Sequence, residues 1–206
     1  MDMQETAQLF YNLGLHFMGL NHLETTLICF RNALMLGFQP AARAYNKMGS
    51  ICFRAKGYEE ALQMFSSAIS EDNSYSIAYY NRCNTYSRMS EYKKAVKDCS
   101  KAIELDSSDA DYYKQRAFLY EKLGKTKLSL ADKAAVEKLP ESSRITGADL
   151  SERQKAEQAV HGINPDAVMT ANARIVAQAG FSEDEIHEQT MEIMRSFSMP
   201  VMRRFE

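Results

Sequence analysis

The residues of this 206-residue sequence that could do chemistry are its histidines and acidic groups. The segment "HEQTM" at residues 187–191 begins like a zinc-metalloprotease helix, in which two histidines four residues apart present ligands on one face. Met191 stands where the second histidine would be, so the ligand pair is incomplete. No Gly-rich phosphate loop and no Gly-x-Ser-x-Gly nucleophile motif is present. We therefore expect no catalytic residue, no metal, no cofactor and no enzymatic activity.

Four cysteines, Cys29, Cys52, Cys83 and Cys99, are widely separated and form no Cys-x-x-Cys pair for zinc or dithiol chemistry. The N-terminal residues lack a basic segment followed by an apolar one, and no apolar run of about 18 residues occurs. These features favour a cytoplasmic protein. We expect four thiols at packing positions, with two disulfides in a secreted protein as the alternative.

Composition and charge favour a helical globular protein. Apolar residues make up 45% of the chain, charged residues 25%, and only 4 prolines interrupt them. The net charge is −2 and no long block carries one sign, so the sequence offers no electrostatic surface for nucleic acid.

The sequence contains a repeated pattern of apolar and small residues, with a period of about 34 or 35 residues, that would position any site. In each repeat, two bursts of apolar residues spaced three or four apart flank a polar turn such as "RAKGYEE" or "RMSEYKK", which predicts a helical hairpin. The second repeat places Tyr45, Met48, Gly49, Tyr58, Ala61, Phe65 and Ala68 in order, and the third places Tyr79, Arg82, Cys83, Tyr86, Tyr92, Ala95, Cys99 and Ala102 at matching offsets.

This pattern resembles the tetratricopeptide-repeat family, whose period is about 34 residues. The resemblance covers about residues 7–139 and implies an all-α fold, a solenoid of stacked helical hairpins with a four-repeat domain over residues 1–140. Small residues such as Ala61 and Ala95 would allow close helix contact. The fourth repeat departs from the pattern in its second half, so we expect its second helix to be exposed on one side or covered by the next segment of the chain.

After Pro140 the repeat is lost, and helix-capping signals return from Asp149 onward. Residues 141–206 are therefore predicted to be a C-terminal helical extension or cap. A separate module and a segment that folds with a partner are the alternatives. The apolar end, residues 191–205, favours contact with the chain's own groove or with a second copy over a disordered tail. Contact with a second copy would make a homodimer through the C-terminal helices.

The family resemblance also implies binding on the concave wall formed by the first helix of each hairpin. Amide groups there would pair with the backbone of an extended peptide, and basic groups would attract acidic ones. The corresponding offsets select Tyr11, Leu15, Asn46, Ser50, Arg54, Tyr80, Asn81, Asn84, Arg88, Lys114, Gln115 and Phe118.

A narrower expectation is a heat-shock co-chaperone clamp for a C-terminal aspartate. The clamp offsets hold Asn46, Ser50, Asn81, Asp111 and Gln115, of which only Asn81 agrees with similar clamps, and Asp111 would repel a carboxylate. The sequence therefore predicts a non-enzymatic adaptor that binds a peptide or helix of a partner protein, with no nucleic-acid or membrane partner. A co-chaperone or a self-associating scaffold is the alternative.

Overall fold

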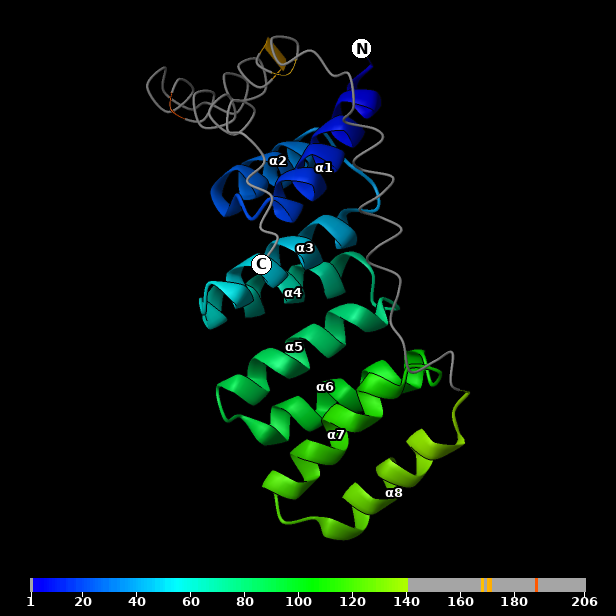
Figure 1. Cartoon of the computed structure of the whole chain (residues 1–206). Coiled ribbons are helices and arrows are strands. Elements are labelled where there is room, and N and C mark those ends of the chain that lie inside the picture. The colour runs from blue at the N-terminus through cyan, green and yellow to red at the C-terminus, as the bar shows by residue number, and fades with distance from the viewer. Residues whose placement is uncertain (1, 141–167, 169, 172–187, 189–206) are drawn as a thin grey trace, which may run out of the picture. The chain divides into compact units, whose positions relative to one another are not determined.

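The computed structural model describes residues 2–140 and residues 168, 170, 171 and 188. The main described part is all helix, which confirms the predicted fold class, and none of its helices is long and apolar enough to cross a membrane. The helices are α1 (Met3–Gly19), α2 (Leu23–Met35), α3 (Ala41–Arg54), α4 (Tyr58–Glu71), α5 (Ser76–Arg88), α6 (Tyr92–Leu105), α7 (Ala110–Lys122) and α8 (Thr126–Lys138) (Figure 1).

The described helices belong to two compact units, residues 2–39 and residues 40–140. The predicted boundary between residues 1–140 and 141–206 stays a prediction. The helices predicted after residue 140, and the apolar end at 191–205, lie outside the described residues.

In the first unit, α1 and α2 form one antiparallel hairpin. Asp2 caps α1, and its capping box with Glu5 satisfies backbone groups at the helix start. Gly14 lets the helices approach closely, because a Cβ at this position would lie 2.6 Å from the ring of Phe30. Thr26 replaces the usual small residue and stays buried because its hydroxyl donates to the His22 carbonyl at 2.7 Å.

In the second unit, three hairpins stack in chain order: α3 with α4, α5 with α6, and α7 with α8. Helix α4 packs on α5 and α6 packs on α7, while α3 contacts α5 and α5 contacts α7 (Figure 1). Helices α3, α5 and α7, the odd-numbered helices of this unit, therefore form one layer of its stack. As predicted, Ala61 and Ala95 are fully buried where paired helices meet, and Leu130 on α8 is exposed.

Each hairpin of the second unit turns in the same way. Lys56, Ser90 and Gly124 have φ values of 65°, 61° and 69° and occupy the same position in successive repeats. The amide after each of them donates to a carbonyl five residues earlier, as in Gly57 N to Cys52 O at 2.9 Å. This left-handed residue closes the first helix and directs the chain into the second.

The expectation of four free thiols is wrong for two cysteines. Cys83 of α5 and Cys99 of α6 form a disulfide with a Cα–Cα distance of 5.5 Å, whereas Cys29 and Cys52 are free thiols. All but Cys52 are buried, as their packing positions predict. The repeat pattern places Cys83 and Cys99 each at a packing position, but it does not show that the two positions meet across the hairpin.

Two repeat-related ion pairs hold the second unit together. The Arg82 guanidinium donates to both carboxylate oxygens of Asp98 at 2.7 and 2.9 Å, and to Ser66 on the preceding hairpin at 3.0 Å. Arg116 repeats the arrangement with Asp132 and Ser100, one repeat further along the chain. Each arginine therefore closes its own hairpin and ties it to the one before.

We expect Ala95→Leu to lower the free energy of unfolding by about 1–3 kcal/mol, because the added carbons overpack a closed helix contact. Ala95 has no exposed surface and packs in a cluster with Cys83, Cys99 and Leu119. Urea unfolding followed by circular dichroism measures the change. Ala134→Leu, on an exposed position of α8, is the control and should change stability by less than about 0.5 kcal/mol. Equal urea midpoints for the two variants would contradict this packing.

Candidate functional site

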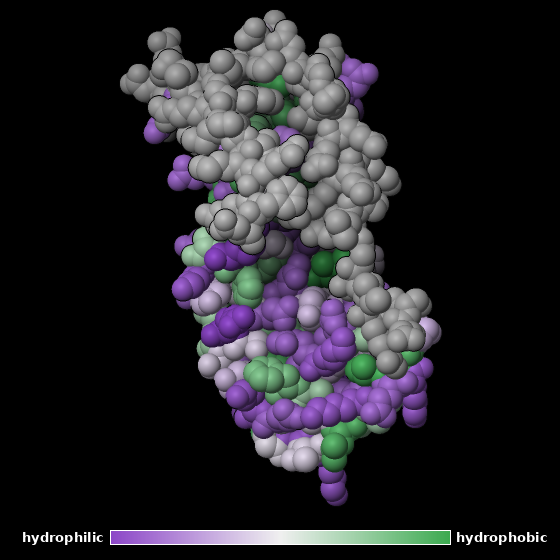
Figure 2. Space-filling model, in the orientation of Figure 1, coloured by the Kyte–Doolittle hydropathy of each residue, from purple (hydrophilic) through white to green (hydrophobic). Residues whose placement is uncertain are grey.

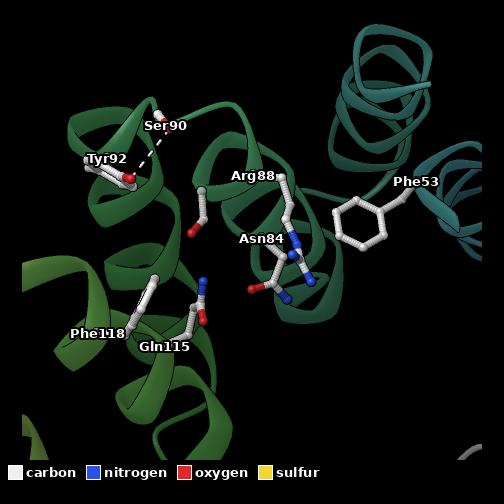
Figure 3. Close-up of a pocket in the computed structure, with 8 residues that line it drawn as sticks. Phe53, Asn84, Arg88, Ser90, Tyr92, Gln115 and Phe118 are labelled. Atoms are coloured by element: carbon white, nitrogen blue, oxygen red, sulfur yellow. Dashed lines mark hydrogen bonds between the residues drawn. The ribbon is translucent and has the colours of Figure 1, made fainter. Parts of the chain in front are cut away.

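The second unit contains a hollow of about 640 Å³, which we call the Arg88 pocket. It lies among the odd-numbered helices and the turn between α5 and α6, and Figure 3 shows its lining side chains facing one another across the hollow. The lining residues are Phe53 from α3, Asn84, Ser87 and Arg88 from α5, Ser90 and Tyr92 from the turn and the start of α6, and Gln115 and Phe118 from α7.

Arg88 supplies the positive charge of the pocket. It is exposed in the last turn of α5, where a cation also complements the helix dipole. Among the described residues it has no carboxylate partner, unlike Arg82 and Arg116, which are each held by an aspartate. Its guanidinium donors are therefore available to an anionic group that enters the pocket.

Neutral polar groups surround this charge. Asn84 and Gln115 bring amide donors and acceptors, and Ser87 brings a hydroxyl. Burial raises the pKa of the Tyr80 phenol, and a side-chain hydrogen bond with Asn84 opposes that shift. Tyr112, 4.9 Å from Tyr80 between ring centroids, supports it from α7.

Three aromatic rings and Ser90 complete the lining. In Figure 3 the Phe53 ring faces Arg88 from the end of α3, and Phe118 stands beside Gln115. The Tyr92 hydroxyl donates to Ser90 at 3.4 Å. Phe118 is 43% exposed and has the Lys122 ammonium 5.2 Å from its ring centroid. The pocket thus combines a cation and amides with apolar surface, which suits an acidic group next to an apolar side chain.

Of the twelve residues that the groove offsets select, Asn84, Arg88, Gln115 and Phe118 line this pocket. Tyr11 and Leu15 of α1 are buried, at 5% and 4% exposure. Phe53, Ser87, Ser90 and Tyr92 also line the pocket, but they do not lie at the fixed offsets that predict the concave wall.

Other predicted residues form a polar seam between α3 and α5. Asn46 is 4% exposed; it accepts from the Asn81 amide at 2.9 Å and donates to the Tyr75 hydroxyl at 3.4 Å. The Ser50 hydroxyl donates to the Asn46 carbonyl at 2.9 Å. Asn46 therefore offers little surface to a ligand, and the seam joins neighbouring helices.

The last three predicted residues lie outside the pocket lining. Tyr80 of α5 packs near Tyr112 of α7, with their ring centroids 4.9 Å apart. Lys114, near the start of α7, forms an exposed ion pair with Asp111 at 2.8 Å. Arg54 lies exposed in the last turn of α3. It begins a row of basic residues at the ends of the odd helices, continued by Arg88 and Lys122 at the same position of the next two repeats.

The surface around the pocket is mostly polar. Figure 2 shows hydrophilic side chains over much of the visible face of the second unit, with small apolar patches between them. Within the described part of the chain, no three histidine, cysteine or acidic side chains gather as a possible metal site. The Arg88 pocket therefore presents one cation, two amides and three aromatic rings on a mostly polar surface.

A tetratricopeptide-repeat family model matches residues 76–109, which span α5 and α6. A tetratricopeptide repeat protein from Parabacteroides merdae is a structural neighbour with a TM-score of 0.61 and 16% identity, over 94% of this chain and 74% of that one. MamA from Desulfovibrio magneticus RS-1 has a TM-score of 0.58 and 20% identity, over 66% and 76% of the two chains. Both likenesses show the fold alone.

The second tetratricopeptide domain of Spaghetti (RPAP3), solved with the HSP90 peptide SRMEEVD, has 28% identity over 48% of this chain and 92% of that chain. Its TM-score is 0.47, so its ligand carries no argument here. No curated protein matches the sequence.

Proposed function

Since the chain belongs to the tetratricopeptide-repeat family, whose members are protein–protein interaction modules, we propose that it is a non-enzymatic adaptor. Its Arg88 pocket binds an extended, acidic segment of a partner protein. The proposal rests on the environment of the Arg88 guanidinium. This guanidinium has no carboxylate partner among the described residues and is surrounded by amides, hydroxyls and aromatic rings.

The neighbouring cations support a segment rather than a single acidic group. Arg54, Arg88 and Lys122 end successive helices of one layer. Packed helices lie about 8–10 Å apart, and an extended chain rises about 3.3 Å per residue. A peptide that crosses the layer would therefore present an acidic side chain to the next cation about every three residues.

The aromatic residues of the pocket add apolar contact. Phe118 and Phe53 stand on opposite sides of Arg88, so an apolar side chain next to the acidic one would lie against a ring (Figure 3). Asn84 and Gln115 would pair with the peptide backbone on the same surface. The partner motif that fits best is an acidic residue with an aliphatic or aromatic neighbour.

The chaperone-clamp alternative has a specific obstacle in this chain. Asn46, at the first clamp offset, is buried in the seam with Asn81. Asp111, at the fourth offset, places a carboxylate where the clamp needs a cation. We therefore propose the Arg88 pocket, and not the clamp positions, as the peptide site.

Selection from a displayed peptide library tests the proposal. The intact chain should select peptides rich in Asp and Glu. Arg88→Ala should weaken binding of a selected peptide about tenfold or more, because one charge-assisted hydrogen bond contributes about 1.5–3 kcal/mol. Fluorescence anisotropy with labelled peptide measures the affinity. Binding should also weaken as salt is raised.

Lys114→Ala is the matched control, because Lys114 is a cation on the same layer that is already paired with Asp111. This substitution should change the peptide affinity less than about twofold, because exposed ion pairs contribute little free energy. Selected peptides without excess acid, or equal affinities of the Arg88→Ala variant and the unaltered chain, would rule the proposal out.

A further inference from the structure

The Cys83–Cys99 disulfide occupies a place that the other hairpins fill differently. The residues at this contact lie 16 positions apart in three hairpins: Gly14 and Phe30, Gly49 and Phe65, and Cys83 and Cys99. In the first two, the glycine backbone lies against the phenylalanine ring, and a Cβ on either glycine would be 2.6 Å from a ring carbon. A packing contact joins those hairpins, and a covalent bond joins the third.

Breaking the bond would disturb the packing at the centre of the third hairpin, because two non-bonded sulfurs cannot lie as close together as two bonded ones. Both cysteine side chains are fully buried, with 0% exposure, so the separated thiols have no open solvent to move into. Reduction removes the cross-link across 16 residues and puts no ring in its place. The hairpin of α5 and α6 would lose stability relative to its neighbours.

This hairpin carries much of the Arg88 pocket. Cys83 directly precedes Asn84, and α5 also carries Ser87 and Arg88, while Tyr92 begins α6. The hairpin also packs on α4 and α7, in the middle of the second unit. Loosening α5 against α6 would displace the pocket donors.

We propose that Cys83 and Cys99 are a reversible redox modification site that controls peptide affinity at the Arg88 pocket. With the disulfide formed, the α5–α6 hairpin holds the pocket side chains in their binding positions. With the disulfide reduced, the hairpin loosens and peptide affinity falls. The affinity part of this inference rests on the proposed function, but the effect on the hairpin itself does not.

The oxidant is a small-molecule disulfide such as oxidised glutathione. One cysteine thiolate attacks a sulfur of the oxidant, which forms a mixed disulfide and releases one thiol. The second cysteine thiolate then attacks the mixed disulfide, forms the Cys83–Cys99 bond and releases the second thiol. Each protein thiol loses a proton, which a released thiolate takes up, and the two electrons lost by the cysteine sulfurs reduce the oxidant to two thiols.

Cys29 is fully buried and Cys52 partly so, and burial raises the pKa of both thiols. Because Cys83 and Cys99 are also buried, exchange needs local opening of α5 and α6. By linkage, a peptide that binds the closed hairpin more tightly should also favour the oxidised form.

The full-length chain, equilibrated with either oxidised glutathione or a phosphine reductant, provides the test. Alkylation in denaturant and mass spectrometry should count two free thiols in the first state and four in the second. The melting temperature should fall by roughly 10 °C on reduction. Amide exchange of residues 84–92 should accelerate, and affinity for a selected acidic peptide should fall about fivefold or more.

Two double variants sharpen the test. Cys83→Gly with Cys99→Phe installs the contact that Gly49 and Phe65 make, so its melting temperature and affinity should not depend on redox state. Cys83→Ala with Cys99→Ala should behave like the reduced chain in both buffers. Cys52→Ser should keep the full redox response, because Cys52 takes no part in the bond.

Four free thiols after equilibration with the oxidant would overturn the inference. Reduction confirmed by mass, with unchanged melting temperature and unchanged exchange at residues 84–92, would overturn it as well. If the library yields no peptide, the proposed function fails while the melting and exchange results still decide this inference. A lower melting temperature without faster exchange or weaker binding would contradict control of the pocket.

Discussion

Phe65→Ala should lower the free energy of unfolding by about 3–5 kcal/mol, the largest loss we expect from one apolar substitution in the second unit. The ring is 1% exposed and lies against the backbone of Gly49. Because Gly49 has no side chain, nothing on α3 can move in to fill the space that the ring leaves. Urea unfolding by circular dichroism measures the loss.

Phe118→Ala is the matched control for that substitution. Phe118 is 43% exposed and lines the Arg88 pocket, so its removal should cost less than about 1 kcal/mol of stability and should weaken peptide binding. A small loss for Phe65→Ala, or equal losses for the two variants, would contradict the contact between Phe65 and Gly49.

Asp98→Ala should lower the free energy of unfolding by about 3 kcal/mol or more, because it leaves a largely buried guanidinium without its partner. The Asp98 and Arg82 side chains are 7% and 20% exposed, and two hydrogen bonds join them. Denaturation in urea gives the value. Arg82→Met with Asp98→Ala should recover part of the loss, because the unpaired charge is removed as well.

Glu104→Ala supplies the comparison for an exposed ion pair. Glu104 binds Lys101 at 2.8 Å on the surface of α6, so its loss should cost less than about 1 kcal/mol. Asp132→Ala, in the repeat-related pair with Arg116, should resemble Asp98→Ala. If Asp98→Ala and Glu104→Ala cost the same, the Arg82 pair does not hold the hairpins together.

The repeat spacing predicts most of the fold because it reports which residues pack. Positions such as Gly49, Ala61 and Phe65 recur at the period of the hairpin, and their burial follows from that register. The spacing does not report which two positions touch across a hairpin. Cys83 and Cys99 were therefore placed correctly in the core but not paired, although they hold the offsets of Gly49 and Phe65.

The candidate site was only partly predictable for a similar reason. Asn84, Arg88 and Gln115 follow from offsets on the first helices. Phe53 and Tyr92 lie at a helix end and beyond a turn, where the left-handed residue of each hairpin directs the chain. Which amide faces its neighbour and which faces solvent depends on side-chain contacts between repeats, and a single repeat does not encode those contacts.

Photo-crosslinking tests the central claim, peptide binding at the Arg88 pocket, most directly. A benzoylphenylalanine is placed at position 118 in one variant and at position 130 in another. Both positions are exposed, at 43% and 59%, but only the first lines the pocket. After irradiation with a selected acidic peptide, mass spectrometry should find peptide attached at position 118 and none at position 130. Excess competitor peptide that carries no label should suppress the attachment at position 118. Equal attachment at both positions, or attachment at position 130 alone, would contradict the claim.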